Sequence, residues 1–141
     1  MKIAVINGPN LNMLGQRNSN HYGTLTLDEI EKKLIKSYPM IEFDFFQSNH
    51  EGTIIDIIQN LDADGLIINP AGYTHTSVSI RDALEIKTFI KVEVHLSDLK
   101  TREDFRQINL IKDVVDYSIA GKKELGYLEA VEYIKRNLNK I

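Results

Sequence analysis

The sequence predicts an α/β fold of three layers, in which helices cover both faces of a five-stranded parallel sheet. Two observations lead to this prediction: five short apolar runs alternate with segments of helical periodicity, and turn-forming residues follow the runs. Such an alternation is typical of parallel sheets with right-handed crossover connections. The 141 residues have the length of one domain and suffice to bury a core, so we expect a single domain over residues 1–141.

The predicted strands are short runs rich in apolar and β-branched residues, as buried parallel strands are. They cover residues 3–6, 41–46, 66–68, 90–96 and 114–120. For five such strands with helical connections, the flavodoxin-like order 2-1-3-4-5 is the natural expectation.

The helices are marked by their first residues and by apolar side chains at helical spacing. Residues 26–29 have the spacing of a capping box, and Pro39 ends the helix that follows. Residues 48–51 form a second capping-box candidate, before a helix whose apolar stripe consists of Ile54, Ile57, Ile58 and Leu61. We expect further helical segments at 77–87, at 101–106 as one or two turns, and from Leu125 to the C-terminus.

The composition excludes several classes of function. A net charge of −3 provides no electrostatic argument for binding nucleic acid or an anionic membrane. Without cysteine there is no disulfide, thiolate nucleophile or zinc–thiolate site. No apolar run approaches the roughly 20 residues of a membrane span, and no signal-peptide pattern opens the chain. We therefore expect a cytoplasmic protein without a nucleic-acid or membrane partner.

The first loop, residues 7–23, is the stretch around which the chain is organised. It follows the first predicted strand and contains Asn10, Arg17 and Tyr22. Open α/β sheets bind their ligands at the carboxyl ends of the strands, which is where this loop begins. Connections in such folds commonly have about 2–6 residues, so a loop of this length suggests a function. We interpret it as an active-site loop.

Polar and reactive side chains follow three of the predicted strands. Because the carboxyl ends of parallel strands share one edge of the sheet, we expect these side chains to converge there, as in a ligand site. The set comprises Asn10, Arg17 and Tyr22 after the first strand, Asn69, Tyr73, Thr74 and His75 after the third, and His95 and Ser97 after the fourth.

The available chemistry is limited. Residues 8–10 lack the glycine spacing of a dinucleotide site and the Lys-Ser/Thr of a P-loop. Glu93 and His95 share one strand face without convincing metal spacing, and Ser97 has no evident partners for a catalytic triad. The remaining groups suit proton transfer on a polyhydroxylated, anionic small molecule. A tyrosine serves as a base only where cations favour its phenolate, and Arg17 could supply that charge.

Over essentially its whole length, the chain resembles the type II 3-dehydroquinate dehydratases, small lyases that use no Schiff-base lysine. Five blocks match the family's motifs in order and with the expected spacing. They are residues 7–11, Arg17 with 22–23, 69–77, 93–97 and 102–106. The chain departs from the family after Arg106, where residues 107–112 replace a polar segment of His-Ser-x-x-Ser type.

The resemblance implies that the single domain is catalytic and assigns roles to five residues. Tyr22 would remove a proton alpha to the ketone of 3-dehydroquinate, and Arg17 would hold it as tyrosinate. Asn10 would help to stabilise the enolate intermediate. His95 would be the general acid that protonates the departing C1 hydroxyl in an anti elimination, and Glu93 would orient it. The product would be 3-dehydroshikimate, an intermediate of aromatic amino acid biosynthesis.

The resemblance also implies how the substrate is held and how the protein assembles. The residues that would grip its carboxylate and hydroxyls are Asn69, His75, Leu96, Ser97 and Arg106. Asp82 would reach the substrate from a neighbouring subunit. Similar enzymes need no metal or cofactor and form homo-dodecamers, which are tetramers of trimers, and they close the loop from Arg17 to Tyr22 as a lid.

Two other hypotheses fit parts of the pattern. Taken singly, Arg102 and Arg106 fit an exposed helix face, and His95 fits a hydrogen-bonded structural histidine. A binding module without catalysis would use the same sheet edge but would have no need for Tyr22 and His95 together. A response-regulator receiver would need acidic residues after the first and third strands, where this chain has asparagines, so we discard it.

Overall fold

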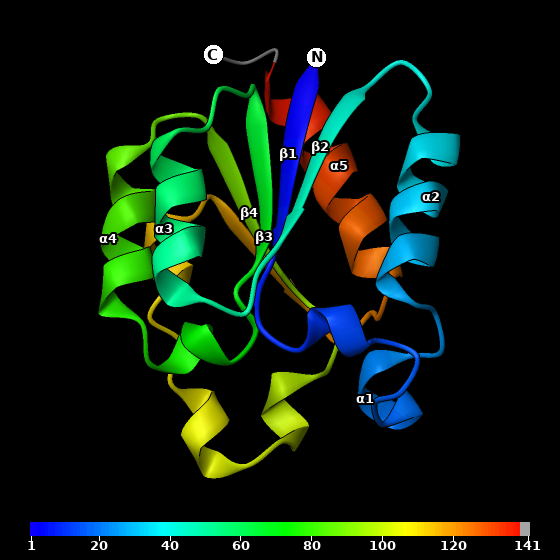
Figure 1. The fold of residues 1–141 in the computed structure, drawn as a ribbon, viewed down its shortest axis with the longest axis vertical. Coiled ribbons are helices and arrows are strands. Elements are labelled where there is room, and N and C mark those ends of the chain that lie inside the picture. The colour runs from blue at the N-terminus through cyan, green and yellow to red at the C-terminus, as the bar shows by residue number, and fades with distance from the viewer. Residues whose placement is uncertain (139–141) are drawn as a thin grey trace.

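The computed structural model describes residues 1–138, so the last three residues of the predicted final helix lie outside it. It contains one five-stranded parallel sheet in the order β2-β1-β3-β4-β5, which confirms the predicted fold and strand order (Figure 1). The strands are β1 (Lys2–Asn7), β2 (Glu42–Gln47), β3 (Gly65–Asn69), β4 (Ile90–His95) and β5 (Tyr117–Ala120). The helices are α1 (Ser19–Tyr22), α2 (Leu27–Ser37), α3 (Glu51–Gln59), α4 (Val78–Ile86) and α5 (Leu125–Leu138).

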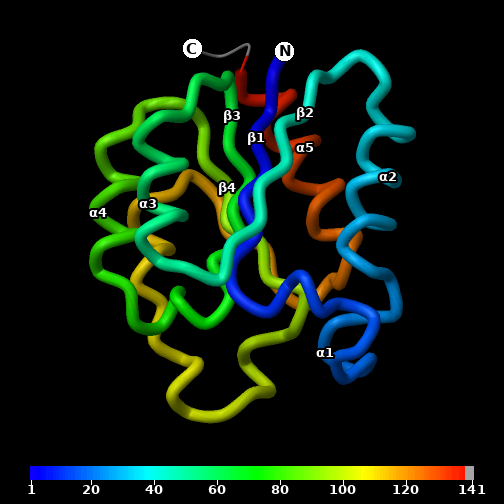
Figure 2. Tube along the Cα trace, in the orientation of Figure 1, coloured from blue at the N-terminus to red at the C-terminus, as the bar shows by residue number. Residues whose placement is uncertain are grey.

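Short 3₁₀ turns complete the fold. They are η1 (Leu11–Met13), η2 (Ala71–His75), η3 (Leu99–Thr101), η4 (Asp104–Gln107) and η5 (Lys112–Val114). The turn η5 lies beside α4, and the other turns lie near the end of the sheet where the strands finish (Figure 1). Figure 2 shows the first loop and the segment that contains η3 and η4 at the end where the strands finish. The predicted ligand edge is therefore surrounded by irregular chain, as active-site loops usually are.

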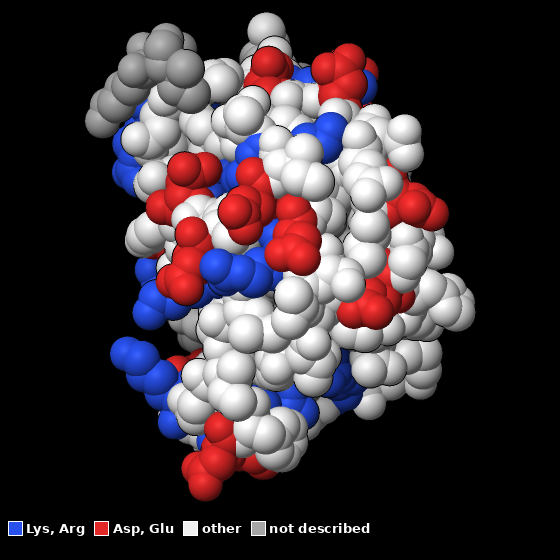
Figure 3. All heavy atoms as spheres, turned by 90° about the vertical axis from the view of Figure 1, so that its left-hand side faces the viewer, with Lys and Arg blue, Asp and Glu red and all other residues white. Residues whose placement is uncertain are grey.

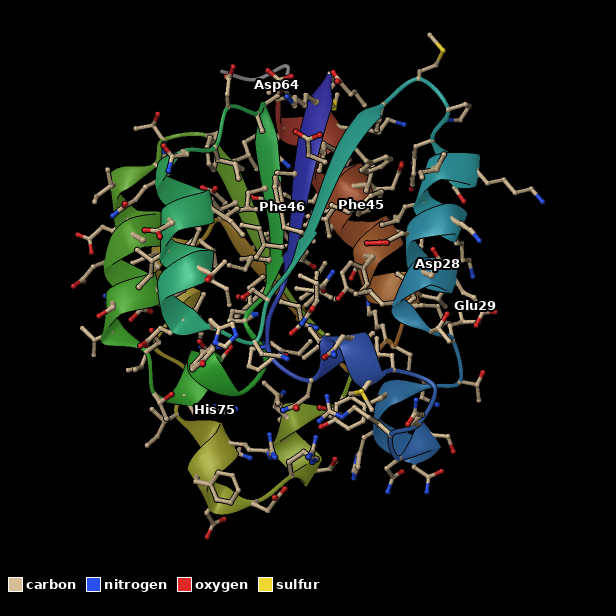
Figure 4. The ribbon with its side chains drawn as sticks, viewed as in Figure 1. Asp28, Glu29, Phe45, Phe46, Asp64 and His75 are labelled. Atoms are coloured by element: carbon tan, nitrogen blue, oxygen red, sulfur yellow. The ribbon has the colours of Figure 1, made fainter. Side chains whose placement is uncertain are left out.

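Two helices cover each face of the sheet. Side chains alternate along each strand, so β1 sends Ile3 and Val5 toward α2 and α5, and Ala4 and Ile6 toward α3 and α4. On the edge strand β2, the neighbouring Phe45 and Phe46 pack in these two different cores (Figure 4). The two apolar layers fix the register of every strand, since a slip by one residue would exchange the faces.

Of the two capping boxes predicted from the sequence, one forms and the other does not. Thr26 and Glu29 form the predicted capping box at α2, because each side chain bonds the other residue's backbone N–H. The second predicted capping box, residues 48–51, is wrong: His50 is the N-cap of α3 and makes no capping bond. The Ser48 hydroxyl instead accepts the His50 N–H at 3.0 Å and closes a local turn.

The fifth strand is shorter than predicted. Residues 114–120 were expected to be extended, but β5 contains only Tyr117–Ala120, and Val114 belongs to η5. The apolar run ends on Val114 and Val115, which pack partly buried beside α4 in the second core. Burial against a helix therefore explains the apolar character of these two residues.

The ends of β1 and β3 approach one another very closely. The Gly8 N–H donates to the Asn69 carbonyl at 2.8 Å. A Cβ atom at Gly8 would lie 2.6 Å from the Pro70 carbonyl oxygen, so only glycine fits here. This contact brings the first loop and η2 together at the edge of the sheet.

A buried tyrosine of α5 forms hydrogen bonds with the last residues of β1 and β3 at the same edge of the sheet. The Tyr127 hydroxyl on α5 donates to the Asn7 side-chain oxygen and accepts the Asn69 amide at 3.2 Å. Asn69 in turn accepts the Ala71 N–H at 3.1 Å, which shapes η2. Tyr127 is fully buried, and this burial raises its pKa above the usual value, although the Asn69 hydrogen bond opposes the effect.

We predict that the protein loses stability as the pH rises above about 10, the pKa of an unfolded tyrosine. The unfolded chain then releases a proton that folded Tyr127 still holds, which favours unfolding. A Tyr127→Phe variant lacks this contribution, and it is less stable near neutral pH by about 1–3 kcal/mol because Asn7 and Asn69 lose their partner. Urea unfolding of both proteins at about pH 8 and about pH 11 measures the difference, and equal losses of stability would contradict it.

The molecular surface carries both signs of charge. On the side that shows α3 and α4, acidic and basic side chains lie next to one another over the helices (Figure 3). Within residues 1–138, no helix is both long and apolar enough to cross a membrane.

Candidate active site

A pocket opens at the carboxyl end of the sheet, where the first loop, η2 and the segment after β4 meet. Within the described chain its wall contains arginine and histidine side chains but no aspartate, glutamate or lysine. The lining residues are Pro9, Asn10, Leu11, Arg17, Tyr22, Asn69, Ala71, Gly72, His75, His95, Leu96, Ser97, Leu99, Arg102 and Arg106. The pocket is therefore cationic and suits an anionic ligand.

Two guanidinium groups surround Tyr22. Arg17 stacks on the face of the ring, with its guanidinium carbon 3.7 Å from the ring centre. Arg102 lies farther from the ring but donates a hydrogen bond to the Tyr22 hydroxyl at 3.0 Å. Two positively charged groups therefore contact Tyr22, one at the face of its ring and one at its hydroxyl.

Arg102 is a residue of the pocket wall to which the sequence analysis assigned no role. Its side chain is only 9% exposed, and it bonds the Ser97 hydroxyl at 3.1 Å as well as Tyr22. Arg102 therefore connects the first loop with the end of β4. The sequence places it 80 residues from Tyr22, and the spacing of four to Arg106 favoured an exposed helix face. Its place in the matching block at residues 102–106 was the available signal.

The positive charges of the pocket are close enough to influence one another. Burial of the Arg17 guanidinium lowers its pKa, and Arg102 and Arg106 act in the same direction while Tyr22 opposes them. Glu103 bonds both Arg102 and Arg106, at 3.3 and 3.2 Å, from outside the pocket wall. An arginine stays protonated through such shifts, so the field in the pocket remains positive.

His95 ends β4 and is held by a buried carboxylate. Its Nε2 lies 2.8 Å from Glu93 Oε2 and 3.3 Å from the Thr74 hydroxyl. Glu93 is completely buried, and Thr74 comes from η2. Because a carboxylate only accepts, Nε2 carries a proton, and Nδ1 is the nitrogen left for a ligand.

Glu93 is ionised in this arrangement. Burial is the strongest single influence and acts against the charge, but hydrogen bonds from His95, Ser118 and Asn109 together hold the pKa of Glu93 below its usual value. An ionised Glu93 accepts the Nε2 hydrogen bond of His95 and fixes the orientation of its ring. The geometry is that of a general acid with an orienting partner.

The other predicted residues of the wall differ in how much of each side chain is free. Asn10 adopts a left-handed conformation with φ 70° and donates its N–H to the Asn49 side chain at 3.0 Å. Its own side chain makes no capping bond to η1, so its amide is available. Asn69 uses its amide on Tyr127. His75 ends η2 at this edge of the sheet (Figure 4). Its Nδ1 donates to the Ile108 carbonyl at 2.7 Å, which leaves Nε2 for a ligand.

Of the three remaining predicted residues, two lie in the pocket wall after β4 and one lies elsewhere, on α4. Leu96 and Ser97 are buried and line the pocket directly after His95. Asp82 does not reach this pocket: it is exposed on α4 and lines a separate shallow groove with Glu85 and Ile86. A single chain therefore brings together the predicted site residues, with Glu93 and Thr74 behind His95, and two exceptions remain. They are Asp82 and Tyr73, whose hydroxyl bonds the Asn49 carbonyl at 2.9 Å outside the pocket wall. Among residues 1–138 no group of three or more potential metal ligands occurs.

Comparison with known proteins identifies the family. The model of the family described as dehydroquinase class II matches residues 1–135. The chain belongs to the class II dehydroquinases. The strand order is also that of the type II dehydroquinase structures.

Individual relatives support the assignment over the full length of this class II dehydroquinase. A 3-dehydroquinate dehydratase of Thermotoga petrophila is 48% identical and aligns with 100% of this chain and 99% of its own. One from Fusobacterium nucleatum is also 48% identical, over 99% of this chain and 100% of its own. The crystal structure of the type II dehydroquinase from Butyrivibrio crossotus matches with a TM-score of 0.92 and 42% identity, over 96% of this chain and 97% of its own.

Proposed function

We propose that this chain dehydrates 3-dehydroquinate to 3-dehydroshikimate, with Tyr22 as base and His95 as acid, in a single catalytic domain over residues 1–141. One observation carries the assignment of roles: a single pocket combines a tyrosine beneath two guanidinium groups with a histidine on a buried carboxylate. These are the two groups that the removal of water from a hydroxy ketone requires.

The first step takes place at the Tyr22 oxygen. The phenolate removes a proton from the carbon alpha to the ketone, and the electron pair of the C–H bond forms an enolate. The negative charge thus moves from Tyr22 to the substrate oxygen without leaving the field of Arg17 and Arg102. Asn10, with a free side-chain amide, supplies a hydrogen bond for the developing oxyanion, directly or through a water.

The second step takes place at His95. The enolate re-forms the ketone, a carbon–carbon double bond forms and the C1 hydroxyl leaves. His95 gives that hydroxyl a proton, so the leaving group is water and the imidazole becomes neutral. Tyr22 now holds the proton taken from carbon, and proton exchange with solvent resets both residues for the next turnover.

Substrate binding uses the remaining groups of the wall. The carboxylate finds backbone N–H donors at Leu96 and Ser97 and the positive charge of Arg106. The ring hydroxyls find hydrogen-bonding groups at Asn69 and His75.

We also propose the assembly and the location. Asp82 completes the pocket of a neighbouring subunit, in trimers that assemble into a homo-dodecamer in the cytoplasm. The support is that Asp82 is exposed on α4 beside Ile86, an isoleucine that is 71% exposed. Sedimentation of the purified protein measures the assembly, and a stable monomer with full activity would contradict it.

Turnover of 3-dehydroquinate tests the function directly. The purified protein is mixed with this compound, and the ultraviolet absorbance of the conjugated enone product is followed over time. Steady product formation is the expected result. If calorimetry detects binding but no product forms, the chain is a binding module and the proposal fails.

We predict that loss of either arginine at Tyr22 moves the acidic limb of the pH profile of kcat/KM upward. Arg102→Gln and Arg17→Gln each remove a positive charge that favours the phenolate, so a higher pH is needed to form the base. The expected displacement is about one pH unit or more for each variant. Arg136→Gln, at an exposed position late in α5, is the matched control. An acidic limb that stays in place in both variants would exclude this role.

A further inference from the structure

We propose that Asn109 and Ser118 are positioning residues of the reaction, which hold Glu93 in the orientation that it needs to support His95. The inference rests on the proposed role of His95 as general acid and extends it to two residues outside the pocket wall. It concerns the segment after Arg106 and the last strand of the sheet, to which the mechanism so far assigns nothing.

Three side chains surround the Glu93 carboxylate. The Asn109 amide donates to both oxygens, at 3.1 Å to each. The Ser118 hydroxyl donates to Oε1 at 2.8 Å, and His95 donates to Oε2 at 2.8 Å. With Glu93 completely buried, these donors replace the water that a carboxylate would otherwise bind.

The two donors reach Glu93 from separate parts of the fold. Ser118 is its direct neighbour on β5, because Glu93 and Ser118 are paired in the parallel ladder. Asn109 lies between η4 and η5, and its side-chain oxygen Oδ1 accepts the N–H groups of Ile111 and Lys112 at 2.8 and 2.9 Å. Asn109 therefore uses both ends of its side chain and cannot turn without breaking a bond.

The residues beside Asn109 also contact the pocket. The Ile108 carbonyl accepts the His75 ring N–H at 2.7 Å, and the Leu110 N–H donates to the Thr74 carbonyl at 2.9 Å. Thr74 is the second partner of His95 Nε2. The tripeptide Ile108–Leu110 thus connects the two histidines of the site through three consecutive residues.

The consequence for catalysis is the tautomer of His95. Donors to Glu93 favour its ionised form, and an ionised Glu93 places the ring proton on Nε2 and leaves Nδ1 for the substrate. A Glu93 that lacked these donors would bind a proton more readily and would then donate to Nε2. The imidazole would then be neutral, with its one proton on Nδ1, and a neutral imidazole is a much weaker acid than the imidazolium that protonates the leaving hydroxyl.

The test uses Ser118→Ala, Asn109→Leu and the double variant. Each removes donors to Glu93, and neither residue lines the pocket. We expect kcat to fall about tenfold in each single variant and about 100-fold in the double variant, part of what a general acid contributes, while KM stays within about twofold. Ser118→Thr retains the hydroxyl and restores kcat. Ser37→Ala, at an exposed position at the end of α2, is the control.

The ¹⁵N NMR spectrum of the imidazole groups provides a second readout that needs no turnover. The signal of His95 is identified by its loss in His95→Asn, and we expect the Nε2–H form in the wild type and a mixture in the double variant. An unchanged kcat in the double variant, or a lowered kcat with the wild-type His95 signal, would overturn the proposal. Failure of the proposed function would be seen separately, as a wild type that forms no product.

Discussion

Tyr22→Phe will lose almost all turnover and keep its substrate affinity. The substitution removes one oxygen atom and leaves the ring stacked against Arg17. Without the phenolate, no group accepts the alpha proton, and we expect kcat to fall by about 10²- to 10⁴-fold, the usual contribution of a general base. The ultraviolet assay measures kcat, and calorimetry with 3-dehydroquinate measures affinity, which we expect to change only a few-fold.

A matched substitution separates this effect from the loss of a tyrosine elsewhere. Tyr38 lies at the end of α2, does not line the pocket, and donates its hydroxyl to the Leu128 carbonyl at 3.3 Å. Tyr38→Phe should keep the wild-type kcat. If Tyr22→Phe also kept a rate within about tenfold of the wild type, less than a general base contributes, another residue would have to be the base.

His95→Asn will have a loss of similar size, for a different reason. The asparagine can still accept and donate hydrogen bonds but cannot deliver a proton to the C1 hydroxyl, which would then have to leave as hydroxide. We expect kcat to fall by about 10²- to 10⁴-fold. The basic limb of the pH profile of kcat should also disappear, because the variant has no imidazolium to lose a proton.

His50→Asn is the control for that substitution. His50 is the N-cap of α3 and makes no side-chain capping bond there. This control should keep both the wild-type kcat and the basic limb. A basic limb that persisted in His95→Asn would show that another group titrates during the elimination, and the assignment of His95 as the acid would be wrong.

Most of the fold was predictable because local patterns and the global fold agree. The alternation of apolar strands and capped helices determined the fold class, and the capping box at Thr26 is a bond between residues three apart. The bounds of an element were harder to predict where contacts with distant parts of the chain determine the local structure. Val114 begins an apolar run that ends in β5, but it belongs to η5 and packs in the second core beside α4.

In the candidate site too, some contacts were predictable from local patterns and others depend on the tertiary structure. The ends of β1, β3 and β4 were predictable meeting points, because parallel strands finish at one edge. Arg102 reaches Tyr22 only through the path of the chain between η3 and η4, and no periodicity encodes that path. Likewise, Asn109 meets Glu93 across 16 residues, in the segment where the chain departs from the family pattern.

Borohydride treatment during turnover tests most directly whether Tyr22 and His95 act as base and acid without an imine intermediate. A dehydratase that forms an imine needs a lysine at the substrate, and the pocket wall, as far as the structure describes the chain, contains none. Borohydride reduces imines to stable amines and would inactivate such an enzyme. With 3-dehydroquinate present, we predict that the treated protein keeps the turnover rate of the untreated protein and gains no mass. Progressive inactivation with attachment of the substrate to a lysine would contradict the assignment of Tyr22 and His95 as base and acid.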